Sequence, residues 1–127
     1  MVKLVQCVRR RPEVSVLEFR AKWKEYGEMI KGGAVALGGV RCTLSTTLAV
    51  KENALFALRR GTQEPFDGIA EIWFENAPAA LAAMQRSEWR EGLARFQAFQ
   101  ESFVDLEHSS FFYAIEDEVF DWSAELG

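Results

Sequence analysis

The sequence predicts a ferredoxin-like α+β sandwich, in which helices cover one face of a four-stranded antiparallel sheet. Three observations support this fold class. Segments that alternate apolar and polar residues and segments with helical spacing follow one another in the order β-α-β-β-α-β, and the pattern shows no internal repeat and no linker-like boundary. The length of 127 residues suits one domain, so residues 1–127 are expected to form a single domain.

The first strand is expected at residues 2–9, where β-branched and polar residues mix in a short run before Pro12. A helix should then begin at Ser15, whose hydroxyl can accept from the third helical N–H while Glu18 reaches back. Gly32 and Gly33 predict its end, because glycine tolerates the left-handed conformation in which helices often stop. Steps of four, three and four residues define its apolar face: Phe19, Trp23, Tyr26 and Ile30.

Two further strands are expected at residues 40–50 and 68–75. Between them, residues 51–67 are predicted to form a long loop, with at most a short turn or strand extension at residues 55–58. Each strand has two distinct faces, because successive side chains point to opposite sides of a sheet. In the strand at residues 40–50, one face carries Val40, Cys42 and Leu44, and the other carries Arg41, Thr43 and Ser45. In the strand at residues 68–75, one face carries Ala70, Ile72 and Phe74, and the other carries Ile69, Glu71 and Trp73.

The second helical region should begin at Asn76, a capping residue followed by Pro78 in the first turn, where the missing N–H of proline does no harm. The helix is predicted to restart at Ser87. A last strand is then expected over residues 108–119. The restarted helix has an apolar face made of Trp89, Leu93, Phe96, Phe99 and Phe103.

Apolar residues are also expected on the sheet face that the helices leave uncovered, namely Ile69, Trp73 and Phe112. A single copy would expose these side chains to water together with two open sheet edges. Two sheets that pack face to face around a two-fold axis remove both defects. We therefore expect a homodimer, closed as a dimeric α+β barrel.

Composition excludes several classes of partner. The net charge of −4 and the pI near 5.1 argue against nucleic acid, which requires clustered basic residues, and the run Arg9–Arg11 is soon followed by Glu13 and Glu18. No signal peptide or membrane span is apparent, so a cytoplasmic location without membrane association is expected.

Motifs for metals and cofactors are equally lacking. Cys7 and Cys42 form neither a disulfide framework nor metal-ligand spacing, and no glycine-rich phosphate loop or GxSxG elbow occurs. A haem would need an axial ligand, and His108 is the single histidine that could supply an imidazole. We expect no metal and no cofactor.

Three segments resemble the EthD-like branch of the dimeric α+β barrel proteins, and together they span nearly the whole chain. They contain Arg9–Pro12 with Phe19, Trp23 and Gly27; then Phe66–Phe74; and then Phe103–Leu106 with Ser110–Phe112 and Glu116. The resemblance implies a homodimer with a ligand cavity, and relatives that act without cofactors as oxygenases, isomerases, cyclases or lyases on aromatic, polyketide or other hydrophobic compounds. The His-Gly-Pro usual at the end of the family's first helix reads Tyr26-Gly27-Glu28 here, so chemistry that relies on the histidine does not carry over.

Glu71 is a candidate catalytic base. It is predicted between Ile69 and Trp73 on the face that points into the barrel, where desolvation would raise its pKa towards neutrality. The alternative is a structural salt bridge, most simply with Arg41 on the neighbouring strand, because buried carboxylates are normally paired.

His108 and Tyr26 are the other two catalytic candidates. His108 can accept a proton from a phenol or an activated carbon, or it can cap the last strand in solvent. Tyr26 can donate a hydrogen bond to a carbonyl or enolate oxygen but is a poor base with an ordinary pKa of about 10; alternatively it is a core residue with its hydroxyl at the rim.

Four side chains are predicted to bind the substrate. Trp23, Trp73 and Phe112 would form apolar walls, or plain core if there is no pocket, and Arg41 would pair with Glu71 or hold an anionic or carbonyl group. These residues predict a cofactor-free enzyme that performs acid–base chemistry on a small hydrophobic, aromatic or polyketide-like molecule, with isomerisation, lyase chemistry or oxygenation as the outcome. The alternative is a non-catalytic binding or accessory protein with the same cavity.

Overall fold

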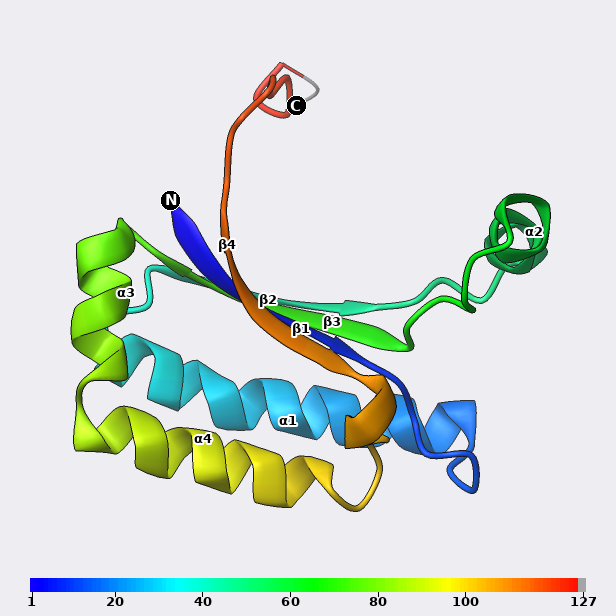
Figure 1. The fold of residues 1–127 in the computed structure, drawn as a ribbon, viewed down its shortest axis with the longest axis horizontal. Coiled ribbons are helices and arrows are strands. Elements are labelled where there is room, and N and C mark those ends of the chain that lie inside the picture. The colour runs from blue at the N-terminus through cyan, green and yellow to red at the C-terminus, as the bar shows by residue number, and fades with distance from the viewer. Residues whose placement is uncertain (126–127) are drawn as a thin grey trace.

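The computed structural model describes residues 1–125 and has the ferredoxin-like α+β fold that the sequence predicts, with one added helix (Figure 1). Helices α1, α3 and α4 lie on one face of a four-stranded antiparallel sheet with the strand order β2-β3-β1-β4. In chain order the elements are β1 (Val2–Val8), α1 (Val16–Ala36), β2 (Arg41–Thr46), α2 (Lys51–Arg60), β3 (Gly68–Phe74), α3 (Ala77–Met84), α4 (Ser87–Gln100), a 3-10 helix (Leu106–His108) and β4 (Ser110–Ile115).

The register of β1 decides which residues face the helices. Val5 pairs with Glu71 of β3 on one side and with Phe112 of β4 on the other, so these three side chains share the face that carries no helix. We call it the open face. Leu4 and Gln6, the neighbours of Val5 along β1, point to the helices instead. Because β3 separates β1 from β2, Cys7 and Cys42 lie on strands that do not adjoin, and both are free thiols, as expected.

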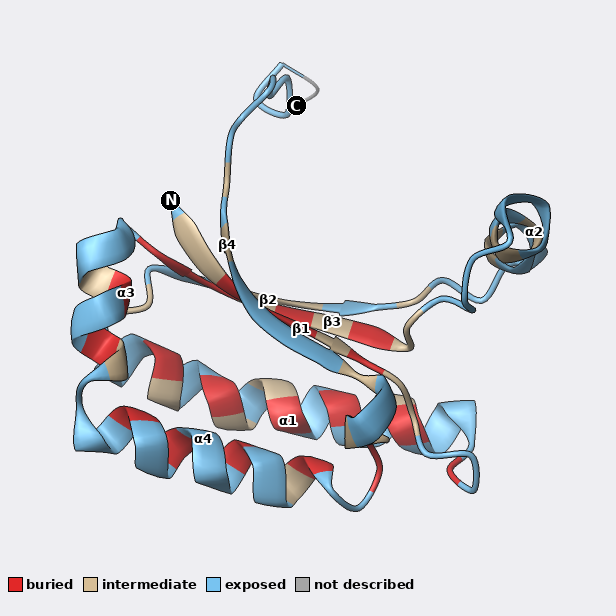
Figure 2. Ribbon diagram, viewed as in Figure 1, coloured by how far each residue is buried: buried red, intermediate tan, exposed pale blue. Residues whose placement is uncertain are grey.

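The core lies between the sheet and the helices, and Figure 2 shows the buried stripe of α1 turned towards the strands. Trp23 is completely buried, and its indole Nε1 donates to the carbonyl oxygen of Ser45 over 3.0 Å. Its ring lies against Gly68, where a Cβ atom would come within 2.6 Å of Nε1. A fully buried side chain of this kind contributes roughly 1.5–3 kcal/mol, so the predicted face of α1 holds the helix to the sheet.

Helix α1 begins as predicted but does not end at Gly32 and Gly33. Ser15 caps it through its hydroxyl, which accepts from the backbone N–H of Glu18 over 3.1 Å. The helix runs through both glycines to Ala36, and the left-handed turn comes later, at Gly38 with φ of +89°. Gly33 has a packing role instead, because a Cβ there would lie 3.0 Å from the ring of Phe96 on α4. Within residues 1–125, neither α1 nor another helix is long and apolar enough to cross a membrane.

The predicted loop over residues 51–67 is wrong for its first part, which forms α2. The sequence has the elements of a short helix: Glu52 lies in the first turn, Arg59 and Arg60 lie in the last, and Gly61 ends it in the left-handed conformation. The charged residues that make this segment look like a loop in the sequence thus stabilise the two ends of the helix. None of the described residues Lys51–Arg60 is buried, and the helix stands away from the rest of the fold (Figures 1 and 2).

The other differences concern element ends. Strand β2 covers residues 41–46 of the predicted 40–50, and α4 stops at Gln100 although Phe103 in the following turn is still buried. The last strand begins at Ser110 rather than His108, because Asp105 caps a 3-10 turn that takes up His108. Its end at Ile115 is also earlier than predicted, and an extended arm follows.

The open face is less apolar in one copy than the sequence predicts. Trp73 was expected in water, but it is 4% exposed because Lys3 and Arg41 lie over its ring, at 5.2 and 4.5 Å from its centroid. Ile69 is partly buried, whereas Phe112 remains 45% exposed. The apolar surface left on this face therefore centres on Phe112.

We predict opposite effects for two glycine substitutions. Gly32→Ala should raise the free energy of unfolding by about 0.5–1 kcal/mol, because the site is inside α1 and a methyl group meets nothing within 4 Å. Gly68→Ala should lower it by about 1–3 kcal/mol through the clash with Trp23. Urea denaturation checks both. A destabilised Gly32→Ala protein would mean that α1 ends at the glycines after all.

Candidate functional site

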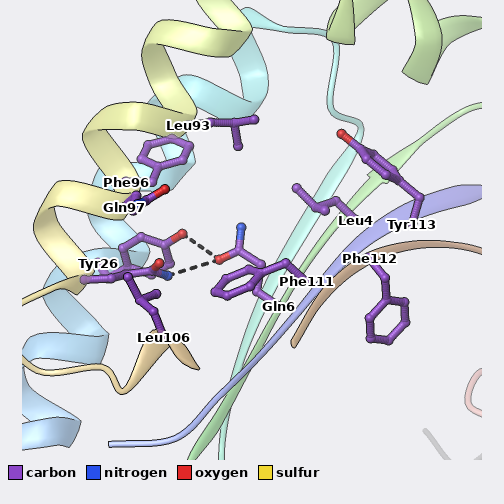
Figure 3. A pocket seen from close by; sticks show the side chains of 11 residues that line it. Leu4, Gln6, Tyr26, Leu93, Phe96, Gln97, Leu106, Phe111, Phe112 and Tyr113 are labelled. Carbon is purple, nitrogen blue, oxygen red and sulfur yellow. Dashed lines mark hydrogen bonds between the residues drawn. The ribbon is translucent and has the colours of Figure 1, made fainter. Parts of the chain in front are cut away.

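A cavity of about 380 Å³ lies beside the sheet, between α4 and the strands β1 and β4 (Figure 3). Such a volume accommodates a small organic molecule. Its walls are mostly apolar, and Tyr26 of α1 closes the inner end. The lining residues are Leu4, Gln6, Tyr26, Leu93, Phe96, Gln97, Gln100, Leu106, Phe111, Phe112 and Tyr113.

Two buried glutamines meet in this cavity. Among residues 1–125, Gln6 and Gln100 are the polar or charged residues that are buried, at 3% and 2% exposed. Gln6 Oε1 accepts a hydrogen bond of 2.6 Å from the hydroxyl of Tyr26 and a longer one of 3.4 Å from Gln100 Nε2. Because both donors point at the same oxygen, they fix the orientation of the Gln6 amide.

The amide nitrogen of Gln6 is left for another partner. Figure 3 shows Nε2 pointing away from Tyr26 and Gln100, towards the part of the cavity near Leu93. Within the part of the chain that the structure describes, the side-chain hydrogen bonds of Gln6 both involve its oxygen. This nitrogen is not enclosed by protein, so it can donate to water or to a ligand oxygen that takes the place of water.

The two tyrosines of the cavity are hydrogen-bond donors rather than bases. Burial raises the pKa of Tyr26, and its hydrogen bond to Gln6 offsets part of the increase. Burial also raises the pKa of Tyr113, to about 12. Both phenols therefore keep their protons at neutral pH. Of the described residues that line the cavity, none is Asp, Glu, His, Lys or Cys.

The structure places Glu71 on the open face, separated from this cavity by the sheet. Its carboxylate Oε2 lies 2.7 Å from the ammonium of Lys3, so the ion pair that the sequence suggests exists, with Lys3 in place of Arg41. Glu116 lies 3.7 Å from the same ammonium and accepts a 2.7 Å hydrogen bond from Trp73 Nε1, which lowers the pKa of Glu116. The hydrogen bond from Lys3 to Glu71 raises the pKa of Lys3.

The remaining predicted residues do not meet at one site. Trp23 is in the core, and His108 is exposed, with Nδ1 2.8 Å from Asp105 Oδ2. Arg41 and Trp73 lie on the open face, and so does the ring of Phe112, which points away from the cavity in Figure 3. Of the seven predicted residues, the structure thus places two, Tyr26 and Phe112, at the cavity, and Phe112 borders it with its ring turned away. The catalytic roles of Glu71 and His108 stay predictions.

The sequence reasoning missed Gln6 and Gln100. A signal for Gln6 was present, because Leu4, Gln6 and Val8 share the helix-facing side of β1 and a polar residue at such a position needs a partner. Gln100 was harder to recognise, because it is the last residue of a helix, where a polar side chain is common. Among residues 1–125, no three His, Cys, Asp or Glu side chains are grouped as a metal ion would require.

The class of protein is a ferredoxin-like α+β domain with a cavity under the helix-covered face of its sheet. The chain belongs to the EthD family, since the model of the EthD domain matches residues 11–107. This confirms the resemblance found in the sequence. A search of curated proteins gives no match.

Solved structures share the fold at low identity. A dimeric protein of unknown function and ferredoxin-like fold from Bacteroides fragilis is 10% identical with a TM-score of 0.60, over 91% of this chain and 95% of the other. An EthD family protein from Bacillus halodurans is 13% identical with a TM-score of 0.60, over 92% and 99%. SnoaB, a cofactor-independent oxygenase from Streptomyces nogalater, is 10% identical with a TM-score of 0.54, over 93% and 94%.

We predict that neither tyrosine of the native protein ionises at the ordinary pKa of about 10. A spectrophotometric titration should show no phenolate until the pH approaches 12, and Tyr26→Phe should leave one phenol that titrates at about 12. A raised pKa in the folded state stabilises the fold below the ordinary pKa, and this contribution is lost as the pH rises above it. Phenolate formation near pH 10 in protein that is still folded would contradict the buried position of Tyr26.

Proposed function

We propose that the protein is a cofactor-independent enzyme that acts on a small, largely apolar molecule in the cavity between α4 and the sheet. One observation supports this above all. A buried tyrosine and a buried glutamine hold the Gln6 side chain by its oxygen, so that its amide nitrogen is presented to a mostly apolar cavity.

The Gln6 amide would bind an oxygen atom of the substrate. The rings of Phe96, Phe111 and Tyr113 would contact its apolar body. When a proton leaves the substrate, negative charge develops on a carbonyl or phenol oxygen, and a fixed N–H donor in a mostly apolar cavity stabilises that charge. Tyr26 and Gln100 keep the donor in place, so little reorganisation is needed during the reaction.

The cavity lining restricts the substrate class. Because none of the described residues that line the cavity is a base at neutral pH, the substrate itself must be acidic enough to lose a proton to water at the cavity mouth. Phenols and carbonyl compounds with activated C–H bonds, as in aromatic or polyketide-like molecules, meet this condition. The structural similarity to SnoaB, which is a cofactor-independent oxygenase, supports this choice.

A second candidate function is binding without turnover. The observation that favours it is the same lack of a base or nucleophile among the cavity residues. In that case the Gln6 amide would fix the orientation of a bound ligand and would not stabilise a reacting one. Measurements of binding and of proton exchange distinguish the two candidates.

We also propose that two copies pair through their open faces. Phe112 is 45% exposed at the centre of this face, and β2 and β4 are open edge strands. A second sheet packed across the face would cover Phe112 and enclose the ion pair of Lys3 and Glu71. The Bacteroides fragilis protein of the same fold, which is described as dimeric, supports this arrangement.

We predict that the cavity binds 1-naphthol and 1-tetralone more tightly than naphthalene, which lacks the oxygen. Gln6→Leu should weaken binding of the two oxygenated probes about five- to tenfold, the net value of one hydrogen bond, and should affect naphthalene less. Titration calorimetry measures the affinities. Deuterium incorporation in deuterated water, followed by NMR, measures catalysis, with 2-tetralone as the substrate because the C–H bonds between its carbonyl and its aromatic ring are activated.

Two further variants keep this test independent of folding. Leu93→Trp at the cavity rim should block all three probes, whereas Leu81→Trp on the exposed side of α3 is the matched control and should not. Faster exchange than in buffer, lost in Gln6→Leu, supports the enzyme. Binding with exchange at the buffer rate supports the binding protein, and unchanged binding in Leu93→Trp would reject the cavity.

Sedimentation should show a dimer at micromolar concentration. Phe112→Glu should shift the protein to monomers, because it places a charge at the centre of the proposed interface. Leu17→Glu, at a 78% exposed position on α1, is the control and should leave the dimer intact. A folded wild-type monomer would reject the pairing.

A further inference from the structure

Helix α2 lacks the contacts that a helix of its length needs. It has 10 residues, and isolated helices shorter than about 12–15 residues are marginal in water. No residue from Lys51 to Arg60 is buried by the rest of the described chain. Phe56 and Leu58 are 57% and 79% exposed, which offers an apolar surface to a partner.

A second unpartnered apolar segment follows β4. We call residues 116–122 the C-terminal arm, which extends away from the sheet on the side opposite the three packed helices (Figure 1). Val119, Phe120 and Trp122 are 89%, 70% and 64% exposed, and the rings of Phe120 and Trp122 lie 5.1 Å apart. Exposed aromatic pairs of this kind usually mark an interaction surface.

The two segments carry opposite charges. The C-terminal arm has four acidic residues and no basic residue, namely Glu116, Asp117, Glu118 and Asp121. Its net charge of −4 equals the net charge of the whole chain. Helix α2 contains Lys51, Arg59 and Arg60 against one acid, Glu52. Its guanidinium at Arg60 lies 5.6 Å from the ring of Phe56, so charge and apolar surface adjoin. An acidic aromatic segment thus complements a basic apolar one.

Within one chain the C-terminal arm and α2 lie at opposite ends of the sheet (Figure 1). The arm follows Ile115, which pairs with Val2 at the start of β1. Helix α2 joins the strand ends that pair at Thr46 and Gly68, and Gly68 pairs with Val8 at the end of β1. Val8 lies six residue steps along β1 from Val2, a distance of about 20 Å at 3.3 Å per step.

We propose that the C-terminal arm of one copy packs on α2 of a second copy. This rests on the pairing of open faces proposed above and specifies its symmetry. The arm follows β4 at one edge of the sheet, and α2 joins β2 and β3 at the other edge, so the two segments lie at diagonally opposite corners. A two-fold axis in the plane between the two sheets and perpendicular to that diagonal places the arm of one copy over α2 of the other. The symmetry then makes two equivalent contacts, and each covers Phe120 and Trp122 with α2 of the other copy.

Disulfide trapping tests this contact directly. In a Cys7→Ser, Cys42→Ser background, a chain with Ala54→Cys on α2 is mixed with a chain with Ser123→Cys beside the arm and oxidised with copper–phenanthroline. A covalent pair of the two different chains is expected. Val35→Cys, at an exposed site on α1 away from the open face, replaces Ala54→Cys in the control and should give no covalent pair with Ser123→Cys.

Hydrogen exchange provides a second readout on the full chain. The amides of α2 should become at least tenfold better protected as the protein concentration rises through the dimer range. Phe120→Ala with Trp122→Ala should remove that protection, and Leu17→Ala on α1 should not.

These experiments test the contact between the arm and α2 independently of the dimer and of ligand binding in the cavity. A dimer in sedimentation without the interchain disulfide would overturn the contact and leave the pairing of open faces standing. A disulfide within one chain carrying both cysteines would assign the arm to its own α2 and would also overturn it. Probe binding in the cavity is measured separately and does not depend on either result.

Discussion

The alternation of side chains along β1 determines where the chemistry of this protein lies. Because β1 is an inner strand, its residues reach both faces of the sheet and touch both neighbouring strands. Gln6 points to the helices and meets Tyr26, whereas Lys3 and Val5 point to the open face and meet Glu71 and Phe112. A shift of one residue in the pairing would exchange the two sets and abolish both environments.

The sheet separates neutral polar chemistry from charged chemistry. On the helix side the buried polar groups are amides and phenols, which can satisfy one another without a counterion. On the open side the polar groups are ions, namely Lys3, Glu71 and Glu116, and they remain partly exposed. An ion in the helix-side cavity would face a much larger desolvation penalty. An uncharged molecule would meet a smaller desolvation penalty in this cavity than an ion would.

The fold was predictable because its main elements bury regular apolar faces. Phe19, Trp23 and Tyr26 have helical spacing in the sequence and are all buried in the structure. Helix α2 was not predictable in this way, since it buries nothing and its charges resemble those of a loop. The end of α1 was misplaced because Gly33 serves the approach of Phe96 rather than a turn.

The candidate site was less accessible to sequence reasoning than the fold. Titratable residues drew attention to Glu71 and His108, yet the cavity is built from uncharged side chains that carry no motif. Tyr26 was found through its position in the helix and the family pattern. Its partners Gln6 and Gln100 are 94 residues apart in sequence, and their meeting depends on a tertiary arrangement that spacing does not reveal.

The aromatic stack along α1 holds the side chains at the inner end of the cavity more firmly than those at its mouth are held. The ring of Tyr26 is stacked on Trp23 at 5.1 Å and on Phe99 at 6.2 Å, so its hydroxyl cannot swing away from Gln6. At the mouth, Leu93 and Phe111 are 37% and 44% exposed, so fewer neighbouring atoms hold their side chains in place. Selectivity should accordingly be strict for the oxygen-bearing head of a guest molecule and tolerant of the length and shape of its tail.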